Sequence, residues 1–275
     1  MLGAIIGDMV GHPFEFKFEK AEGFPLFSKG SGPTDDTYMT LAIARTLFLN
    51  RDNLYDIENL KKTAINQMRD IANNHRDTQW GERFYKWLFE GGSANYSCGN
   101  GAGMRISPVG WVAESEEQVK ILSKTLTEIS HTHPEAFIGA ECVAMCVYLA
   151  RIGKSKEYIR DYVSEHYYPR IKNLRYDWIW QTYEADENGY YVTCQGSIPE
   201  SVVSFLDSTD FEDAIRKAIK YGGDTDTQAC MTGAIAEAYY GVPYELEDKM
   251  LEYLPKDLIS TYYGFDTIKK KRIKR

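Results

Sequence analysis

The stretch Gly222-Gly223-Asp224-Thr225-Asp226-Thr227, which continues as QACMTGAIAEAYY over residues 228–240, decides the fold. Residues 227–240 of this stretch are apolar on nearly every face, which is typical of a helix in the middle of a bundle. Residues 37–50 and 136–150 have the same character. Outer helices with one apolar stripe are expected where charges recur at regular spacing, over 56–73, 116–130, 155–167 and 210–220. The sequence therefore predicts a compact, single-domain, all-α bundle.

Local signals place the helix boundaries. Ser115-x-x-Gln118 and Thr209-x-x-Glu212 are typical capping boxes, and Pro134 suits a first helical position. Helix ends are expected at three glycines, Gly153, Gly222 and Gly241. Strand signals are sparse, and only residues 190–195 are expected to be extended.

Composition narrows the class of protein. The 275 residues are 43% hydrophobic, enough for a sizeable core, and carry a net charge of −8. Six of the 32 basic residues lie in the last seven positions, so we expect a domain over 1–265 and a basic tail over 266–275. The acidic body repels nucleic acid, which leaves only that tail for such a contact.

Compartment and redox state follow from what the sequence lacks. No apolar run approaches the roughly 20 residues of a membrane helix, so no membrane association is expected. The first residues, MLGAIIGD, lack a basic region and contain Asp8, which predicts a cytoplasmic protein without a cleaved signal. Five widely spaced cysteines without a C-x-x-C pair predict buried, reduced thiols.

Two acidic clusters head buried helices: Thr34-Asp35-Asp36-Thr37 and Asp224-Thr225-Asp226-Thr227. One interpretation is helix capping, because Asp and Thr side chains accept hydrogen bonds from free N–H groups. Capping needs one such residue, however, and no Lys or Arg occurs over 31–44 or 221–236 to neutralise the pairs of carboxylates. Oxygen-only donors suit Mg²⁺, with Mn²⁺ as a substitute, and two helix starts brought together could enclose two ions.

Other motifs fail at the second cluster. An EF-hand loop beginning at Asp224 would need Glu at its twelfth position, where Ile235 stands. The Asp-x-Asp-x-Thr start of an aspartyl-phosphate phosphatase is broken by Gln228. Both alternatives are therefore weaker than a magnesium site.

A glycine-rich stretch and two histidines are further candidates. The N–H groups of Gly99-Asn100-Gly101-Ala102-Gly103-Met104-Arg105 could converge on a phosphate, although a flexible connector has the same composition. His131 and His133 precede the helix expected at Pro134. His133 is the preferred substrate contact of the two, against a capping or packing role.

Five segments in this order resemble the ADP-ribosylglycohydrolase family. They are Gly7-Asp8-Met9-Val10-Gly11 with Glu15, Thr34-Asp35-Asp36-Thr37, Gly99-Asn100-Gly101 with Met104-Arg105, Thr132-His133-Pro134, and the stretch over 222–227. The resemblance covers residues 3 to about 241. It implies an orthogonal helix bundle with a binuclear magnesium centre that holds the ribose hydroxyls while the C1″ bond is hydrolysed.

The resemblance also implies roles for single residues. The family's metal ligands correspond to Thr34, Asp35, Asp36, Asp224, Asp226 and Thr227. Glu15 and Asp36 are the candidate catalytic residues, and the substrate-lining segments correspond to Gly99, Asn100, Gly101, Gly103, Met104, Arg105 and His133. Ser97 departs from the pattern, because some arginine-directed members carry Asp there, so the linkage that is cut is left open.

These residues favour a hydrolase that removes ADP-ribose from a modified protein or from a small ADP-ribosyl substrate, with arginine as the preferred acceptor. Two ions can orient a cis-diol and lower the pKa of a water, which suits an oxocarbenium-like transition state. Two alternatives are a silent binding module for ADP-ribose or NAD-like ligands and a metal-dependent phosphoesterase acting on a small nucleotide.

Overall fold

The structure, a computed structural model, describes residues 1–17, 23–182 and 189–273 and confirms the all-α prediction. No strand occurs in these ranges, only isolated bridges such as Gly99 with Thr193. The α-helices are α1 Leu2–Gly11, α2 Asp35–Leu49, α3 Ile57–Asn74, α4 Glu82–Phe89, α5 Gly101–Met104, α6 Ser107–Val112, α7 Glu116–Glu128, α8 Pro134–Arg151, α9 Lys156–His166, α10 Tyr176–Thr182, α11 Cys194–Leu206, α12 Phe211–Lys220, α13 Thr225–Tyr240, α14 Tyr244–Tyr253 and α15 Lys256–Ile273, and the 3₁₀ helices are η1 His12–Phe14, η2 Pro169–Lys172 and η3 Tyr190–Val192.

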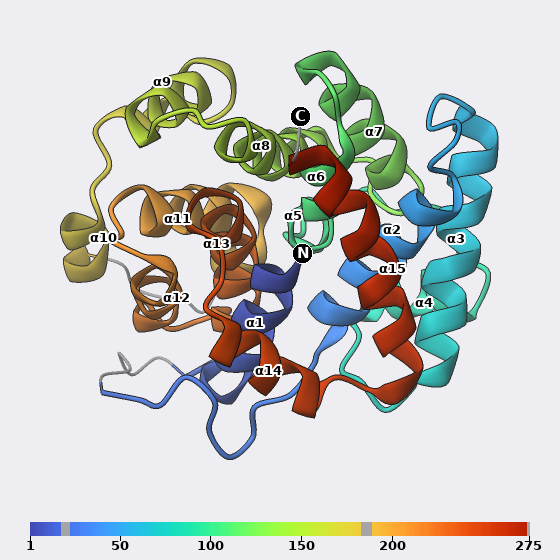
Figure 1. The fold of residues 1–275 in the computed structure, drawn as a ribbon, viewed down its shortest axis with the longest axis horizontal. Helices are drawn as coiled ribbons and strands as arrows, with labels where there is room; N and C mark the ends of the chain where they lie inside the picture. The colour runs from blue at the N-terminus through green and yellow to red at the C-terminus, as the bar shows by residue number, and fades with distance from the viewer. Residues whose placement is uncertain (18–22, 183–188, 274–275) are drawn as a thin grey trace.

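Helices α1 and α13 lie side by side near the middle of the molecule (Figure 1). They touch backbone to backbone, because a Cβ added at Gly3 would lie 2.1 Å from the carbonyl oxygen of Gly233 and one at Gly7 would lie 2.0 Å from that of Ala229. Helices α11 and α12 pack on one side of this pair and α2 on the other (Figure 1). The three segments expected to be apolar all round form the buried helices α2, α8 and α13.

Most helix boundaries fall where the local signals predicted them. Ser115 caps α7 by accepting a hydrogen bond from Gln118 N at 3.1 Å, and α8 begins at Pro134. The predicted cap at Thr209 is wrong by one residue. Asp210 caps α12 by accepting from Asp213 N at 2.9 Å, while Thr209 N donates to the Asp213 carboxylate.

The extended segment expected over 190–195 is wrong. Residues 190–192 form η3, and α11 begins at Cys194. The Thr193 side chain accepts a hydrogen bond from Gly196 N at 3.2 Å, so a helix cap overrides the strand propensity of the preceding Tyr-Tyr-Val.

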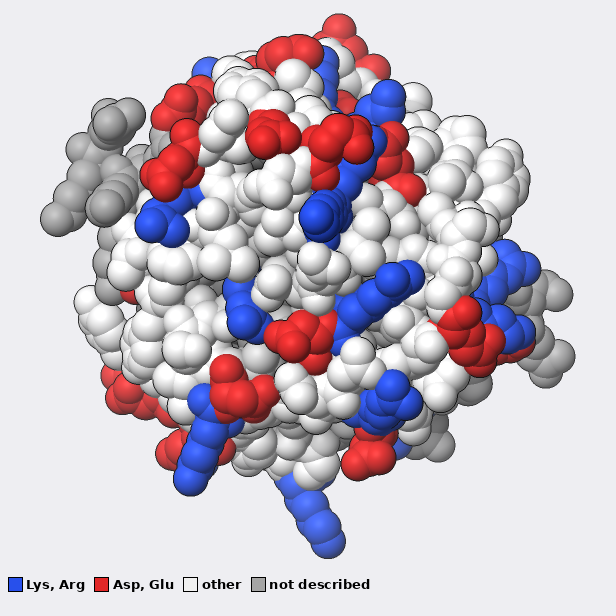
Figure 2. All heavy atoms as spheres, turned by 90° about the vertical axis from the view of Figure 1, so that its right-hand side faces the viewer, with Lys and Arg blue, Asp and Glu red and all other residues white. Residues whose placement is uncertain are grey.

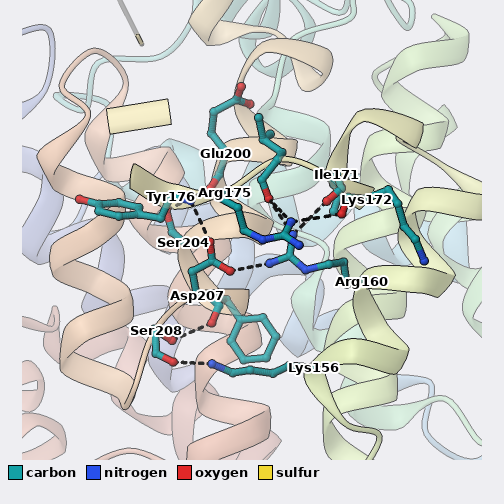
Figure 3. A network of polar contacts seen from close by, with 12 residues as sticks. Lys156, Arg160, Ile171, Lys172, Arg175, Tyr176, Glu200, Ser204, Asp207 and Ser208 are labelled. Atoms are coloured by element: carbon teal, nitrogen blue, oxygen red, sulfur yellow. Dashed lines mark hydrogen bonds and ion pairs between the residues drawn. The ribbon is translucent and has the colours of Figure 1, made fainter. Parts of the chain in front are cut away.

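A half-buried arginine holds the chain that links α9 to α11. Figure 3 shows Arg160 reaching from α9 towards Asp207 and the carbonyl groups of the 170–175 segment. Its Nη1 donates to the carbonyl oxygens of Ile171 at 2.9 Å and Leu174 at 2.8 Å, and its Nη2 pairs with Asp207 at 2.5 Å. Asp207 also accepts from Tyr176 N at 2.8 Å. One guanidinium and one carboxylate thus fasten η2 and the start of α10 to the end of α11.

The last described segment, over residues 256–273, is a helix. The boundary expected at residue 266 falls inside α15, and Lys269 forms an ion pair with the buried carboxylate of Glu237. The last two residues of the predicted tail lie outside the described ranges. On the face shown in Figure 2, basic and acidic side chains alternate without a continuous basic area. No described helix has the length and hydropathy needed to cross a bilayer, and the five cysteines form no disulfide.

Candidate active site

Helix α1 ties the two acidic helix starts together. At the start of α2, the carboxylate of Asp8 accepts hydrogen bonds from Thr34 N and Thr37 N, both at 3.0 Å, and from Thr34 Oγ1 at 2.6 Å. At the start of α13, Thr225 Oγ1 donates to the carbonyl oxygen of Gly11 at 2.9 Å. Asp8 therefore caps the helix that follows Thr34, 26 residues along the chain, and both clusters converge on one end of α1.

The convergence creates two groups of carboxylates that share one member. Oxygen atoms of Asp8, Asp36 and Asp226 lie within 4.8 Å of one another, and so do those of Glu15, Asp224 and Asp226. Thr227 Oγ1 links the two helix starts directly, because it donates to Asp36 Oδ2 at 3.1 Å. The two acidic clusters thus lie together, as expected from the sequence.

Glu15 reaches this group through backbone pairing. Phe16 N donates to the carbonyl oxygen of Gly223 at 2.7 Å, and Gly223 N donates to that of Lys17 at 3.3 Å. Gly223 has φ of 77°, a left-handed conformation that glycine adopts without strain. The turn before Asp224 thereby holds the segment that carries Glu15.

Burial and mutual repulsion raise the pKa of these acids. The pKa of Asp35 is raised to about 8 by burial and by the charges of Asp8 and Asp224. Burial, with the charges of Asp224 and Asp8, raises the pKa of Glu15 to about 7. The pKa values of Asp36 and Asp226 lie well above the ordinary range for the same two reasons. Among the described residues none of these acids forms an ion pair with Lys, Arg or His.

Helix capping accounts for only part of the arrangement. Thr34 caps α2 by accepting from Asp36 N at 3.3 Å. Asp224 occupies the cap position of α13 but makes no capping bond, and its carboxylate accepts from Asn100 Nδ2 at 2.7 Å. Asp36 Oδ1 is buried without any hydrogen-bond partner among the described residues. An unpaired buried carboxylate oxygen amid like charges fits a site for a hard divalent cation.

A cavity of about 610 Å³ opens over the carboxylates. Its floor includes Asp35, Asp36, Asp224, Asp226 and Thr227, and Glu15 lies at its edge. Trp80, Phe84 and Tyr96 form an aromatic side that faces the glycine-rich stretch. A volume of this size can hold a nucleotide-sized ligand. A second cavity of about 410 Å³ adjoins it and shares Glu15, Asp35 and Asp226, while Thr34 lines only the second.

Hydrogen bonds at Gly99 and Asn100 hold the glycine-rich stretch in place. Gly99 N donates to Ser97 Oγ at 3.1 Å and Asn100 N to the carbonyl oxygen of Val192 at 3.0 Å. Gly99, Asn100, Gly101, Met104 and Arg105 line the cavity. Gly103 is not one of the lining residues, because it packs against Ile198 and Met231.

The two histidines before α8 have different surroundings. His133 caps α8 by accepting from Glu135 N at 3.1 Å, and its ring lies 4.6 Å from that of Tyr96. It does not line the cavity, whereas His131 does. His131 was the less favoured of the two histidine candidates, and the aromatic side was not predicted, because nothing in the sequence connects residues 80–96 with the acidic clusters. The isolated bridge of Asn95 with His131 joins that segment to the chain before α8.

Comparison with known proteins identifies the family. The family model described as ADP-ribosylglycohydrolase matches residues 1–270. The ADP-ribosyl-[dinitrogen reductase] glycohydrolase of Rhodospirillum rubrum is 26% identical over 88% of this chain and 84% of its own length. The ADP-ribosylhydrolase ARH3 of Homo sapiens is 25% identical over 94% of this chain and 90% of its own. A solved structure described as an ADP-ribosylglycohydrolase-related protein complex has the same fold, with a TM-score of 0.60, 21% identity and coverage of 99% and 95%. The chain therefore belongs to the ADP-ribosylglycohydrolase family and is a hydrolase that acts on ADP-ribose glycosidic linkages.

Proposed function

We propose that this protein is a magnesium-dependent ADP-ribosyl hydrolase that cleaves the C1″ glycosidic bond between ADP-ribose and a protein arginine. The observation that carries the proposal is the pair of carboxylate groups that share Asp226 on the floor of the larger cavity. The four buried acids at this place, Asp8, Asp36, Asp224 and Asp226, come from opposite ends of the chain and would not lie together without cations to neutralise them.

The residues that would hold two Mg²⁺ ions, or Mn²⁺ in their place, are Thr34, Asp35, Asp36, Asp224, Asp226 and Thr227. The structure adds Asp8, which is grouped with Asp36 and Asp226 and also positions Thr34. When bound, the ions supply Lewis acidity for the ribose hydroxyls and for the attacking water.

Two residues of the chain are suited to proton transfer. Glu15 is half-buried at the edge of both cavities, where water has access, and its pKa is raised to about 7 by burial and by the charges of Asp224 and Asp8. A carboxylate that water can reach beside the proposed metal ligands can take a proton from water and return it to the leaving group. Asp36 has an unpaired oxygen facing the same cluster and is the second candidate.

The second cavity supports arginine as the acceptor. Four acids line it, Glu15, Asp35, Asp77 and Asp226, and no Lys or Arg is among its lining residues. An acidic cavity next to the proposed bond-breaking site favours a cationic guanidinium over a neutral serine side chain.

The test uses Asp226→Asn, with Asp210→Asn as a matched control at an exposed helix cap outside the site. Mg²⁺ at a hundred times its Kd should stabilise the wild type by about 2.7 kcal/mol, a rise in Tm of about 5–10 °C. Asp226→Asn should abolish this rise and the release of ADP-ribose. It should also raise Tm in EDTA, because a neutral amide relieves the repulsion that lifts the pKa of Asp226.

The control variant should keep both the magnesium response and turnover. The substrates are arginine-, serine- and nucleic-acid-linked ADP-ribose, with the product identified by mass. Phosphate release with the glycosidic bond intact would point to the phosphoesterase, and tight ADP-ribose binding without turnover to the silent module. An Asp226→Asn variant that responds to Mg²⁺ like the wild type would refute the metal site.

A further inference from the structure

One corner of the larger cavity has a buried positive charge without a counter-ion. The Arg105 side chain is fully buried, and no described Asp or Glu forms an ion pair with it. Its Nε and Nη1 have no hydrogen-bond partner among the described residues. The corner is therefore electropositive, in contrast to the acidic floor.

Arg105 determines the direction of the hydrogen bond that the Ser130 hydroxyl makes. Arg105 Nη2 donates to Ser130 Oγ at 2.6 Å, and arginine has no acceptor atom. Ser130 Oγ lies 2.9 Å from His131 Nδ1, and the structure shows no other acceptor for the serine proton among its described residues. The hydroxyl therefore donates to His131 Nδ1, because the reverse arrangement would leave a buried O–H without an acceptor.

A His131 ring that accepts at Nδ1 carries its proton on Nε2. That atom has no hydrogen-bond partner among the described residues, and His131 lines the cavity although it is only 7% exposed. Nε2 is also close to the glycine-rich stretch, 4.0 Å from a Cβ built on Gly99 and 3.9 Å from one built on Gly101. A Cβ at either position would therefore be in ordinary van der Waals contact with this nitrogen.

We infer that His131 Nε2–H is a permanently neutral hydrogen-bond donor for an anionic phosphate oxygen of the ligand, with its tautomer set by Arg105 through Ser130. This inference rests on the proposed function, since the anion it serves is the diphosphate of the ADP-ribosyl group. Burial and the charge of Arg105 lower the pKa of His131 to about 3, which agrees with a ring that stays neutral during turnover.

A neutral donor backed by a buried cation suits a diphosphate for two reasons. It attracts the anion without adding a second charge that would need desolvation. It also favours the diphosphate beside Arg105, because a positive charge attracts the anion that the carboxylates repel. The bound ligand would lie with its phosphates at His131 and its ribose over Asp226.

The experiment measures ADP-ribose binding by calorimetry in Mg²⁺ with two matched variants. In His131→Asn the amide can replace Nδ1 and keep the Ser130 contact, but nothing replaces Nε2. In His131→Gln the amide nitrogen reaches the Nε2 position. We expect His131→Asn to weaken ADP-ribose binding about tenfold to a hundredfold, as for a hydrogen bond to a charged group, and His131→Gln to stay within about threefold of the wild type.

Adenosine, which has no phosphate, is the ligand control and should bind both variants like the wild type. Equal ADP-ribose affinity of His131→Asn and wild type, or an equal loss with adenosine, would overturn the inference while leaving hydrolysis by the wild type intact. A wild type that neither binds nor hydrolyses ADP-ribosyl substrates would instead overturn the proposed function. Long-range ¹H–¹⁵N spectra of the wild type should show the Nε2–H tautomer of His131 from pH 5.5 to 8. An Nδ1–H tautomer would refute the hydrogen-bond chain from Arg105 through Ser130 to His131, even if the variants fail to fold.

Discussion

Replacing Gly7 by alanine tests whether the contact between α1 and α13 builds the site. The new Cβ would lie 2.0 Å from the carbonyl oxygen of Ala229 and 2.7 Å from Cys230 N, and both are backbone atoms that cannot rotate away. To restore an ordinary separation of at least 3.4 Å, the helices must move apart by about 1.4 Å. Overpacking of this kind costs up to about 3 kcal/mol, against a gain of about 1 kcal/mol from helix propensity.

The expected net loss is about 2 kcal/mol, a fall in Tm of about 4–8 °C for a domain of this size. The shift also separates Asp8 from Asp226, so turnover should fall about a hundredfold, as for a misplacement of about 1 Å in an active site. Thermal melts and initial rates measure the two effects. Gly264→Ala in α15 is the control, because its Cβ meets nothing nearer than 3.7 Å and should be neutral or slightly stabilising. A Gly7→Ala protein with wild-type Tm and rate would refute the reasoning.

Three further perturbations probe other parts of the structure. Arg160→Met should destabilise the fold by about 3 kcal/mol in urea unfolding, because the half-buried carboxylate of Asp207 loses its ion pair and two carbonyl groups lose their hydrogen-bond donor. Lys86→Met, which removes an exposed ion pair, is the control and should cost less than about 1 kcal/mol. Gly223→Ala should lower the free energy of unfolding by about 1–2 kcal/mol, because its φ of 77° is unfavourable for alanine, and should slow turnover, because the same residue holds the segment of Glu15. Gly81→Ala is the control, since its φ lies outside that region and there is open space around its Cβ. Equal melts of the two variants would contradict this prediction. The pKa of His131 is lowered to about 3, so the unfolded chain binds more protons than the folded one between pH 3 and about 6.5. The contribution of His131 to stability is therefore complete above pH 6.5 and declines as pH falls towards 3. His131→Gln should show a shallower decline of Tm over this range than the wild type.

The central helices could be predicted because their signal is local. A helix that is apolar all round must be surrounded by other elements, and α2, α8 and α13 are buried for that reason. The acidic starts of α2 and α13 could be recognised from their chemistry, since pairs of carboxylates without neighbouring cations need an explanation. The predicted cytoplasmic location, the number of ions and the acceptor stay predictions.

The rest depends on contacts between distant parts of the chain. Gly3, Gly7 and Gly11 recur every four residues in α1, which indicates a close helix contact but does not identify α13 as the partner. Asp8 was named only as part of the segment that precedes Glu15, and its capping of α2 could not be foreseen because 26 residues separate it from Thr34. His133 caps helix α8, whereas His131 pairs with Asn95. The sequence does not reveal this difference, because the two histidines are only two residues apart.

The shared position of Asp226 in both carboxylate groups also has a consequence for biosynthesis. Asp8 and Asp36 leave the ribosome early, but Asp226 and α13 follow about 190 residues later, a delay of roughly 10–40 s at ordinary elongation rates. Until α13 docks, α1 has no partner for its glycine face and the nascent chain has no complete set of ligands. The proposed metal centre is therefore complete only after α13 has been translated.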